Sequence, residues 1–214
     1  MNLTIIILAL FAPFITAHFT LTYPLARGDN KSLQREVPCS GLAQSSERTK
    51  ISLESPTFPI SVNLTHDEVA MQFLLAIGSE PETNYNVTLS DTFRVEEKGE
   101  FCLPDMLITA DILGRELEDG LDLTLQVQIN GYSRGGLYAC ADLQVTSKPV
   151  PPPPSSTCRN ITGVTAIPFR GIAAHRNANP PDPTGEAMRM AAWEVISLAV
   201  VGGFAVLITG ALEV

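Results

Sequence analysis

Histidine is the residue type in this sequence best suited to bind a transition metal, and it occurs at His18, His66 and His175. The free α-amine and the imidazole Nδ1 of an amino-terminal histidine can close a six-membered chelate ring on one metal ion. A second imidazole would complete a T-shaped set of three nitrogen donors. Such a set suits Cu(II), which prefers tetragonal geometry and has the highest affinity in the divalent series. Zn(II) prefers a tetrahedral set.

The residues before His18 predict that it becomes the first residue of the mature chain. Residues 5–12 (IIILALFA) are too short to cross a bilayer and are typical of the apolar part of a secretory signal peptide. Ala17 supplies a small residue at the cleavage site, although Ile15 is bulkier than usual and no Lys or Arg precedes the apolar run. We therefore expect residues 1–17 to be removed. The alternative is a buried N-terminal helix, in which His18 is an ordinary internal histidine.

The second histidine of the predicted donor set is His66, which lies in the polar stretch 63–68 (NLTHDE) between two expected strands. Loops carried by a rigid β-sandwich are a common place for binding residues. The neighbouring Asp67 and Glu68 are weaker candidates, better explained as solvated turn residues. His175 falls in an expected linker and is discounted. A single histidine is usually a surface group, so the specific signal is the combination of His18 and His66.

The elements that must position these histidines are predicted to be β-strands. Short apolar and β-branched runs, separated by Gly, Pro, Asn and Asp, predict strands at 51–53, 60–64, 69–76, 86–89, 106–110, 121–130 and 137–145. Residues 121–129 alternate apolar with polar side chains, as in a sheet with one face in solvent. No long helical period is visible. The pattern predicts an all-β fold, a sandwich of the immunoglobulin or fibronectin kind.

The C-terminal end predicts a lipid anchor. Residues 195–212 contain no charge and form a marginal transmembrane segment, but only two residues follow and no basic stop-transfer segment is present. A GPI-addition signal, removed on attachment, fits this pattern better than a retained helix. The candidate acceptor residues are Asn177, Asn179 and Gly185. We expect the protein at the extracellular face of the plasma membrane or in the cell wall.

A run rich in proline follows the last expected strand, and a Pro/Gly/Asn-rich stretch then continues to about residue 184. Such segments form stiff or extended spacers. The sequence thus divides into a signal peptide (1–17), the sandwich (18–158), a stalk (159–187) and a GPI-signal tail (188–214).

Secretion also explains the cysteines and sequons. Four cysteines, Cys39, Cys102, Cys140 and Cys158, predict two disulfides and leave three possible pairings. Four sequons that would survive cleavage are candidate glycosylation sites, at Asn30, Asn63, Asn86 and Asn160. The formal charge of -9 argues against nucleic acid and anionic lipid as partners. An acidic surface is compatible with binding cations, although it also simply keeps a secreted protein soluble.

Three stretches together resemble a known family. They are 18–24 (HFTLTYP), 37–41 (VPCSG) and 136–142 (GLYACAD). The chain is similar, from residue 18 to about 158 and in its tail, to the secreted fungal proteins that are related to lytic polysaccharide monooxygenases and include the Bim-type copper acquisition factors. The resemblance implies a sandwich that holds one Cu(II) in a histidine brace formed by His18 and His66. It also implies that the carboxylate of Asp142 takes the place that the monooxygenases give to an axial tyrosine or phenylalanine.

The resemblance implies a role in copper homeostasis, including uptake, with a membrane copper transporter as a conceivable partner. A carboxylate ligand favours Cu(II) and fills coordination space, which favours capture over redox turnover. Asp142 has a second interpretation, because alternation places it on the face of Cys140, where a buried carboxylate needs some partner, metal or not.

Two other functions stay open. The first is a copper-dependent polysaccharide monooxygenase. Against it, the sequence offers no row of aromatic residues for a flat glycan, and its one tryptophan, Trp193, lies in the tail. The second is a structural wall module whose histidines are incidental. No catalytic triad, acid/base carboxylate pair or phosphate loop is recognisable.

Overall fold

The computed structural model describes residues 18–79, 81–130 and 136–169. The expected signal peptide, His175, the three anchor acceptor candidates and the apolar tail lie outside these residues. Within the described ranges, no helix is long and apolar enough to cross a membrane.

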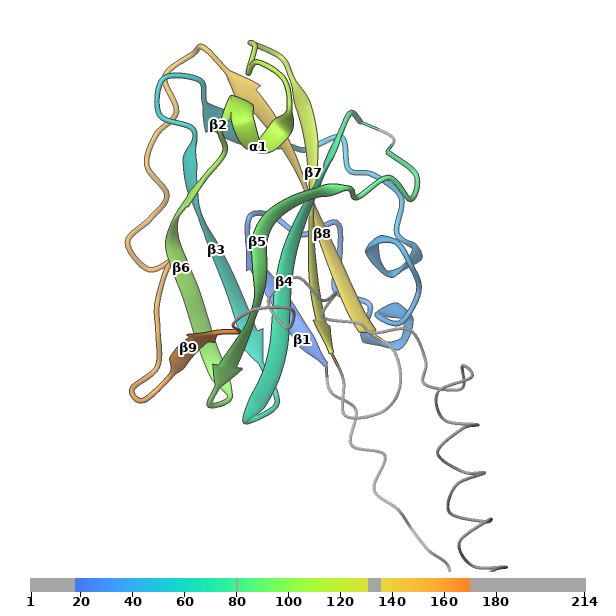
Figure 1. Cartoon of the computed structure of the whole chain (residues 1–214), viewed down its shortest axis with the longest axis vertical. Coiled ribbons are helices and arrows are strands. Elements are labelled where there is room, and N and C mark those ends of the chain that lie inside the picture. Colours follow the sequence, from blue (N-terminus) through green and yellow to red (C-terminus); the bar gives the residue numbers. More distant parts are fainter. Residues whose placement is uncertain (1–17, 80, 131–135, 170–214) are drawn as a thin grey trace, which may run out of the picture. The chain divides into compact units, whose positions relative to one another are not determined.

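Two β-sheets form the framework of the described residues (Figure 1). The first is antiparallel with the order β1-β3-β6, and its strands are β1 (Phe19–Tyr23), β3 (Thr57–Leu64) and β6 (Gly99–Leu107). The second has the order β2-β8-β7-β4-β5-β9 and comprises β2 (Thr49–Ser52), β4 (Glu68–Ile77), β5 (Val87–Glu96), β7 (Asp122–Asn130), β8 (Gly136–Thr146) and β9 (Thr165–Pro168). Only β2, which pairs with β8, runs parallel to its neighbour in these ladders.

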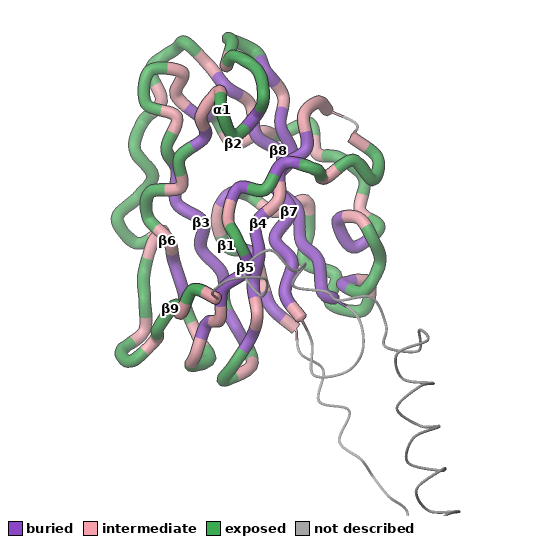
Figure 2. The backbone as a smooth tube through the Cα atoms, in the orientation of Figure 1, coloured by how far each residue is buried: buried purple, intermediate pink, exposed green. Residues whose placement is uncertain are grey.

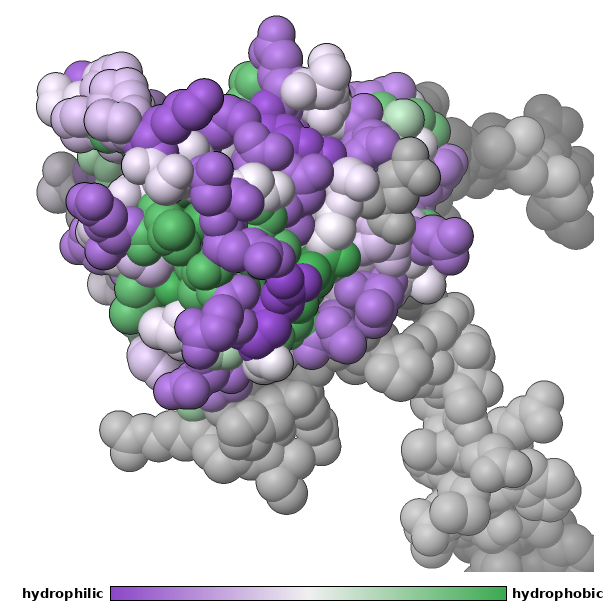
Figure 3. All heavy atoms as spheres, turned by 90° about the horizontal axis from the view of Figure 1, so that it is seen from above, coloured by the Kyte–Doolittle hydropathy of each residue, from purple (hydrophilic) through white to green (hydrophobic). Residues whose placement is uncertain are grey.

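Helical structure in the described residues is short. It consists of the 3-10 turns η1 (Lys31–Leu33) and η2 (Cys39–Gly41) and the helix α1 (Ala110–Leu113). The Thr109 hydroxyl caps the start of α1, and Gly114 ends it with a left-handed backbone (φ 67°) that glycine adopts at little cost. Viewed from the end that carries α1, hydrophobic side chains gather in one patch bordered by hydrophilic ones (Figure 3).

The core lies between the two sheets (Figure 2). Phe19, Leu64 and Phe101 of the first sheet are almost fully buried, as are Phe73 and Leu125 of the second. These apolar side chains leave water together, and that burial is the main favourable contribution to folding. The all-β sandwich predicted from the sequence is confirmed.

Strand boundaries differ from the prediction in both sheets, and β5, expected at 86–89, continues to Glu96. The strand expected at 106–110 begins earlier, since β6 starts at Gly99 and includes Pro104. Pro is tolerated there because β6 is an edge strand of its sheet. Neither β1 nor β9 was predicted.

The polar face of β7 is buried, so the prediction of a solvent-exposed face was wrong. Thr124, Gln126 and Gln128 are 0%, 3% and 2% exposed. Residues 26–45, which we call the cover segment, contribute to this burial, and the Gln126 side-chain oxygen accepts a hydrogen bond from the Cys39 N–H (3.2 Å). Gln128 donates to the Gln72 side chain (2.6 Å). The alternating pattern therefore predicted correctly that this face of β7 is polar, but it did not reveal that the face is buried.

Two disulfides resolve the three possible pairings. Cys39–Cys140 joins the cover segment to β8, and Cys102–Cys158 joins the segment after β8 to β6. Beyond Cys158 the chain stays attached to the sandwich, because the Ile161 N–H donates to the Glu100 carbonyl (3.0 Å) and β9 pairs with β5. The expected boundary at residue 158 thus lies inside the folded unit, and the first ten residues of the expected stalk belong to it.

Candidate metal centre

The register of the first sheet brings the two candidate histidines to one end of the sandwich. Phe19 pairs with Leu64 and Thr20 with Asn63, so the same register continued by one residue places His18 opposite Thr65. The Thr65 hydroxyl donates to the His18 carbonyl. His66 is the next residue, in the turn before β4. Both histidines are partly exposed.

A hydrogen bond fixes the tautomer of His18. Its Nε2 lies 2.7 Å from the Lys31 carbonyl oxygen. A carbonyl oxygen only accepts, so Nε2 carries a hydrogen, and in the neutral imidazole Nδ1 is the ring nitrogen without one. Nδ1 is also the nitrogen that a chelate with the α-amine of the same residue requires. Metal-binding histidines commonly donate their other N–H to a carbonyl in this way, so the orientation of His18 fits a metal-binding imidazole.

The turn that supplies the Lys31 carbonyl is held by Gln34. The Gln34 side chain, 3% exposed, donates to the Phe19 carbonyl (2.6 Å) and accepts from the Phe19 N–H (3.3 Å). Its own carbonyl accepts from the Tyr138 N–H (2.8 Å). Gln34 therefore ties η1 to the first residue of β1 and to β8. Sequence reasoning missed Gln34 and Lys31, because one acts through a buried amide in a polar loop and the other through its backbone.

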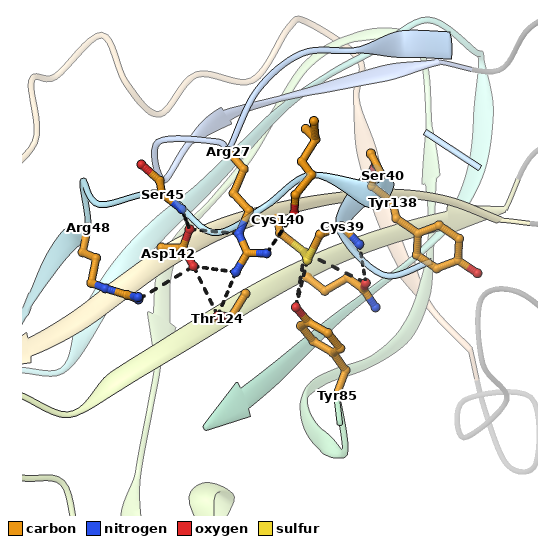
Figure 4. The surroundings of a disulfide bond; sticks show 12 residues. Arg27, Cys39, Ser40, Ser45, Arg48, Tyr85, Thr124, Tyr138, Cys140 and Asp142 are labelled. Atoms are coloured by element: carbon orange, nitrogen blue, oxygen red, sulfur yellow. Dashed lines mark hydrogen bonds and ion pairs between the residues drawn. A yellow bond between two sulfur atoms is a disulfide. The ribbon is translucent and has the colours of Figure 1, made fainter. Parts of the chain in front are cut away.

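The structure does not bring Asp142 to the histidines. Its buried carboxylate accepts two hydrogen bonds from Arg27, at 2.7 Å from Nη2 and 2.9 Å from Nε, and another from the Ser45 N–H at 2.8 Å (Figure 4). Asp142 lies four residues beyond Tyr138 on β8, about 13 Å along the strand. His18 is linked to β8 at Tyr138 through the neighbouring Phe19 and Gln34. The geometry therefore gives no support for Asp142 as a copper ligand, because its carboxylate is paired with Arg27.

Within the described part of the chain, no cluster of acidic side chains takes the place of Asp142 as a candidate metal ligand. Among the residues that the structure describes, no group of three or more His, Cys, Asp or Glu side chains is placed to hold a metal ion. The exposed Asp67 and Glu68 carboxylates lie 3.6 and 3.8 Å from the cationic groups of Lys98 and Arg94. Both side chains are exposed to solvent, as the sequence predicted, although Glu68 is the first residue of β4 and not part of the turn.

Two titratable groups near the Cys39–Cys140 disulfide, the Asp142 carboxyl and the Tyr85 hydroxyl, have shifted pKa values. Burial alone would raise the pKa of Asp142, but hydrogen bonds from Arg27 and the Ser45 N–H, with the charges of Arg27 and Arg48, hold that pKa below its ordinary value. Burial raises the pKa of Tyr85 to about 12, so its hydroxyl stays neutral, 2.8 Å from the Cys39 sulfur (Figure 4). The carboxylate is thus ionised and paired within the fold.

Comparison with known proteins decides the family. The sequence profile described as "Copper acquisition factor BIM1-like" matches residues 16–163. The chain belongs to the BIM1-like copper acquisition factor family. This membership supports a copper-related role, and it confirms the resemblance seen in the sequence.

Individual relatives of this BIM1-like chain are fungal proteins. The chain is 43% identical to an uncharacterized protein of Aspergillus fumigatus over 233 aligned positions, which cover 92% of the chain and 96% of the relative. It is 30% identical to the copper acquisition factor BIM1 of Cryptococcus neoformans var. neoformans, over 65% of each chain. It is 28% identical to the lytic polysaccharide monooxygenase-like protein X325 of Yarrowia lipolytica, over 78% of the chain and 62% of the relative.

The role of Asp142 can be tested by Asp142→Asn. This change leaves the buried Arg27 charge without its carboxylate, so we expect unfolding to require roughly 3–5 kcal/mol less free energy at neutral pH. The wild-type advantage should be complete above the ordinary carboxyl pKa of about 4 and should shrink as the pH falls below it, because protonation of Asp142 then becomes linked to unfolding. Urea unfolding at pH 7 and pH 3 measures both.

The exposed Asp105 provides the control, since Asp105→Asn removes the same charge from the surface and should change stability little. At a temperature where both variants are folded, Cu(II) spectra should match the wild type. A Cu(II) spectrum altered only in Asp142→Asn would return Asp142 to the copper site.

Proposed function

We propose that this chain captures Cu(II) outside the cell through a histidine brace. After removal of residues 1–17, the α-amine and Nδ1 of His18 and the imidazole of His66 would supply three nitrogen donors. The observation that carries the proposal is the 2.7 Å contact between His18 Nε2 and the Lys31 carbonyl, which leaves Nδ1 as the nitrogen able to chelate. Family membership supports copper as the metal.

Capture is favoured over polysaccharide oxidation by the surface. An enzyme that works on a flat glycan needs aromatic side chains exposed to stack on sugar rings. Among the described residues, the large hydrophobic side chains that are exposed are all aliphatic, namely Leu25, Val37, Leu107 and Ile112. Because Asp142 is paired with Arg27, the argument that a carboxylate ligand favours Cu(II) capture has no support in this structure. The preference for capture over oxidation therefore depends on the surface and on family membership.

Binding of Cu(II) to the mature chain tests the brace directly. The chain that begins at His18 should show an electron paramagnetic resonance spectrum with couplings from three nitrogens. A chain that retains Ala17 lacks the α-amine of His18, so we expect a loss of those couplings and an affinity lower by about 100-fold or more, because tethered donors gain a large effective concentration.

Two histidine variants are matched controls. His66→Ala should remove one nitrogen coupling, whereas His175→Ala should leave spectrum and affinity unchanged. Equal affinity of the Ala17-extended and mature chains would eliminate the brace. Oxidised oligosaccharides released from chitin or cellulose with reductant and peroxide would favour the monooxygenase alternative.

The turn behind His18 should tune the affinity. Gln34→Ala removes both hydrogen bonds that hold Phe19 to η1, so we expect Cu(II) affinity to fall about 10- to 100-fold, as for other residues that orient metal ligands. Lys31→Ala keeps the main-chain carbonyl that accepts from His18 and should change affinity little. Isothermal titration of the folded variants measures both, and equal affinities for the two variants would remove Gln34 from the site.

We also propose that the protein is held at the cell surface by a GPI anchor added at one of the candidate residues Asn177, Asn179 or Gly185. The support is the uncharged apolar run at 195–212, which follows the small candidate acceptor Gly185 after a short spacer. A phospholipase specific for phosphatidylinositol should release the protein from intact cells into the medium. Retention on the cells after this treatment, together with extraction by detergent alone, would indicate a transmembrane helix instead.

A further inference from the structure

The segment after β8 completes the free edge of the first sheet. Residues 147–164, which we call the strap, leave β8, pass through the prolines 151–154 and reach β6 at the Cys102–Cys158 disulfide. Because β6 is an edge strand of the β1-β3-β6 sheet, its outward N–H and C=O groups need partners. The strap provides one of these partners at Glu100, whose carbonyl accepts from the Ile161 N–H.

Asn160 acts in this edge as a substitute for a strand. Its Oδ1 accepts from the Cys102 N–H (2.7 Å), and its Nδ2 donates to the Cys102 carbonyl (3.1 Å). A peptide strand would bind the edge residue through the same two groups, one acceptor and one donor. The side chain of Cys102 is bonded to Cys158 at the same position. One residue of β6 thus holds the strap through both its backbone and its sulfur.

This arrangement conflicts with a glycan on Asn160, although residues 160–162 form a sequon. Two hydrogen bonds to the same residue require the Nδ2 hydrogen that lies on the side of Oδ1. A glycan converts the side-chain amide to a secondary amide, which strongly prefers the form that places the substituent on the side of the oxygen. The first sugar would then occupy the place of the Cys102 carbonyl.

The other three sequons have no such conflict. Asn63 and Asn86 are exposed. Asn30 is exposed as well and caps η1 through Oδ1, which accepts from the Ser32 N–H (3.2 Å). A sugar on its Nδ2 leaves that acceptor in place.

We infer that Asn160 is not a glycan acceptor in the folded protein. Its amide docks the strap on the edge of β6, and docking and glycosylation of this residue exclude one another. Asn160 is an exposed residue like the other three, so the two hydrogen bonds of its amide, not burial, exclude a glycan and leave asparagines 30, 63 and 86 as the acceptors.

Mass spectrometry of protein secreted by a glycosylating eukaryotic host tests the modification. Enzymatic removal of N-glycans in ¹⁸O water converts a glycosylated asparagine to labelled aspartate. We expect the peptide that contains Asn160 to be unlabelled in folded, monomeric protein, while labelled sites come from the other three sequons. A label at Asn160 in most molecules would overturn the inference.

Thermal unfolding tests whether the Asn160 amide docks the strap. This test does not depend on whether any sequon carries a glycan. Thr162→Ala destroys the sequon but keeps Asn160, so we expect its Tm to equal that of the wild type. Asn160→Asp also destroys the sequon, but an ionised carboxylate cannot donate to the Cys102 carbonyl, and its Tm should fall by about 4–10 °C. Lowering the pH below about 4 protonates the introduced carboxyl group, restores a donor and should narrow this difference. Equal Tm values for the two variants at pH 7 would overturn the docking role.

Discussion

A buried polar face requires a partner for every hydrogen-bonding group, and this requirement organises the protein around β8. The outward positions of β8 are Tyr138, Cys140 and Asp142, and the cover segment meets each of them. Tyr138 binds Gln34 through the backbone, Cys140 is bonded to Cys39, and Asp142 is paired with Arg27. Unpaired groups here would each cost on the order of 1–3 kcal/mol, so the attachments must form together.

The candidate copper site is an outcome of that constraint. The cover segment has little regular structure of its own, so its attachments to β8 fix its path. Gln34 transmits this path to Phe19, and the turn that precedes it delivers the Lys31 carbonyl to His18. The polar cover and the imidazole that it orients therefore form one connected network. A defect in the cover segment would therefore disturb the orientation of His18 through Gln34, at a distance from the candidate copper ligands themselves.

The sequence predicted what depends on local chemistry. Alternation located β7, an apolar run between turn residues located β8, and the sequence around His18 and His66 led to the hypothesis of one shared site. It could not predict which partner satisfies a buried group, because that depends on contacts between distant residues. Asp142 is the clearest case, since a carboxylate beside Cys140 suits a metal or an arginine equally, and Arg27 lies 115 residues away in the chain. The burial of Gln126 and the docking of β9 have the same origin, in segments that fold back over a sheet.

Folding and metal affinity are separable in such a protein. The sandwich, its cover segment and the Lys31 carbonyl orient the imidazole of His18, and none of these contacts uses the α-amine as a free base. While residue 17 is attached, that nitrogen belongs to a planar amide whose lone pair is delocalised, so it is a poor metal ligand. Cleavage changes one bond and creates a basic nitrogen beside an imidazole whose tautomer is already set. The proposed affinity would then arise at the moment of processing, without rearrangement of the core, because the imidazole of His18 is already oriented when proteolysis releases the α-amine.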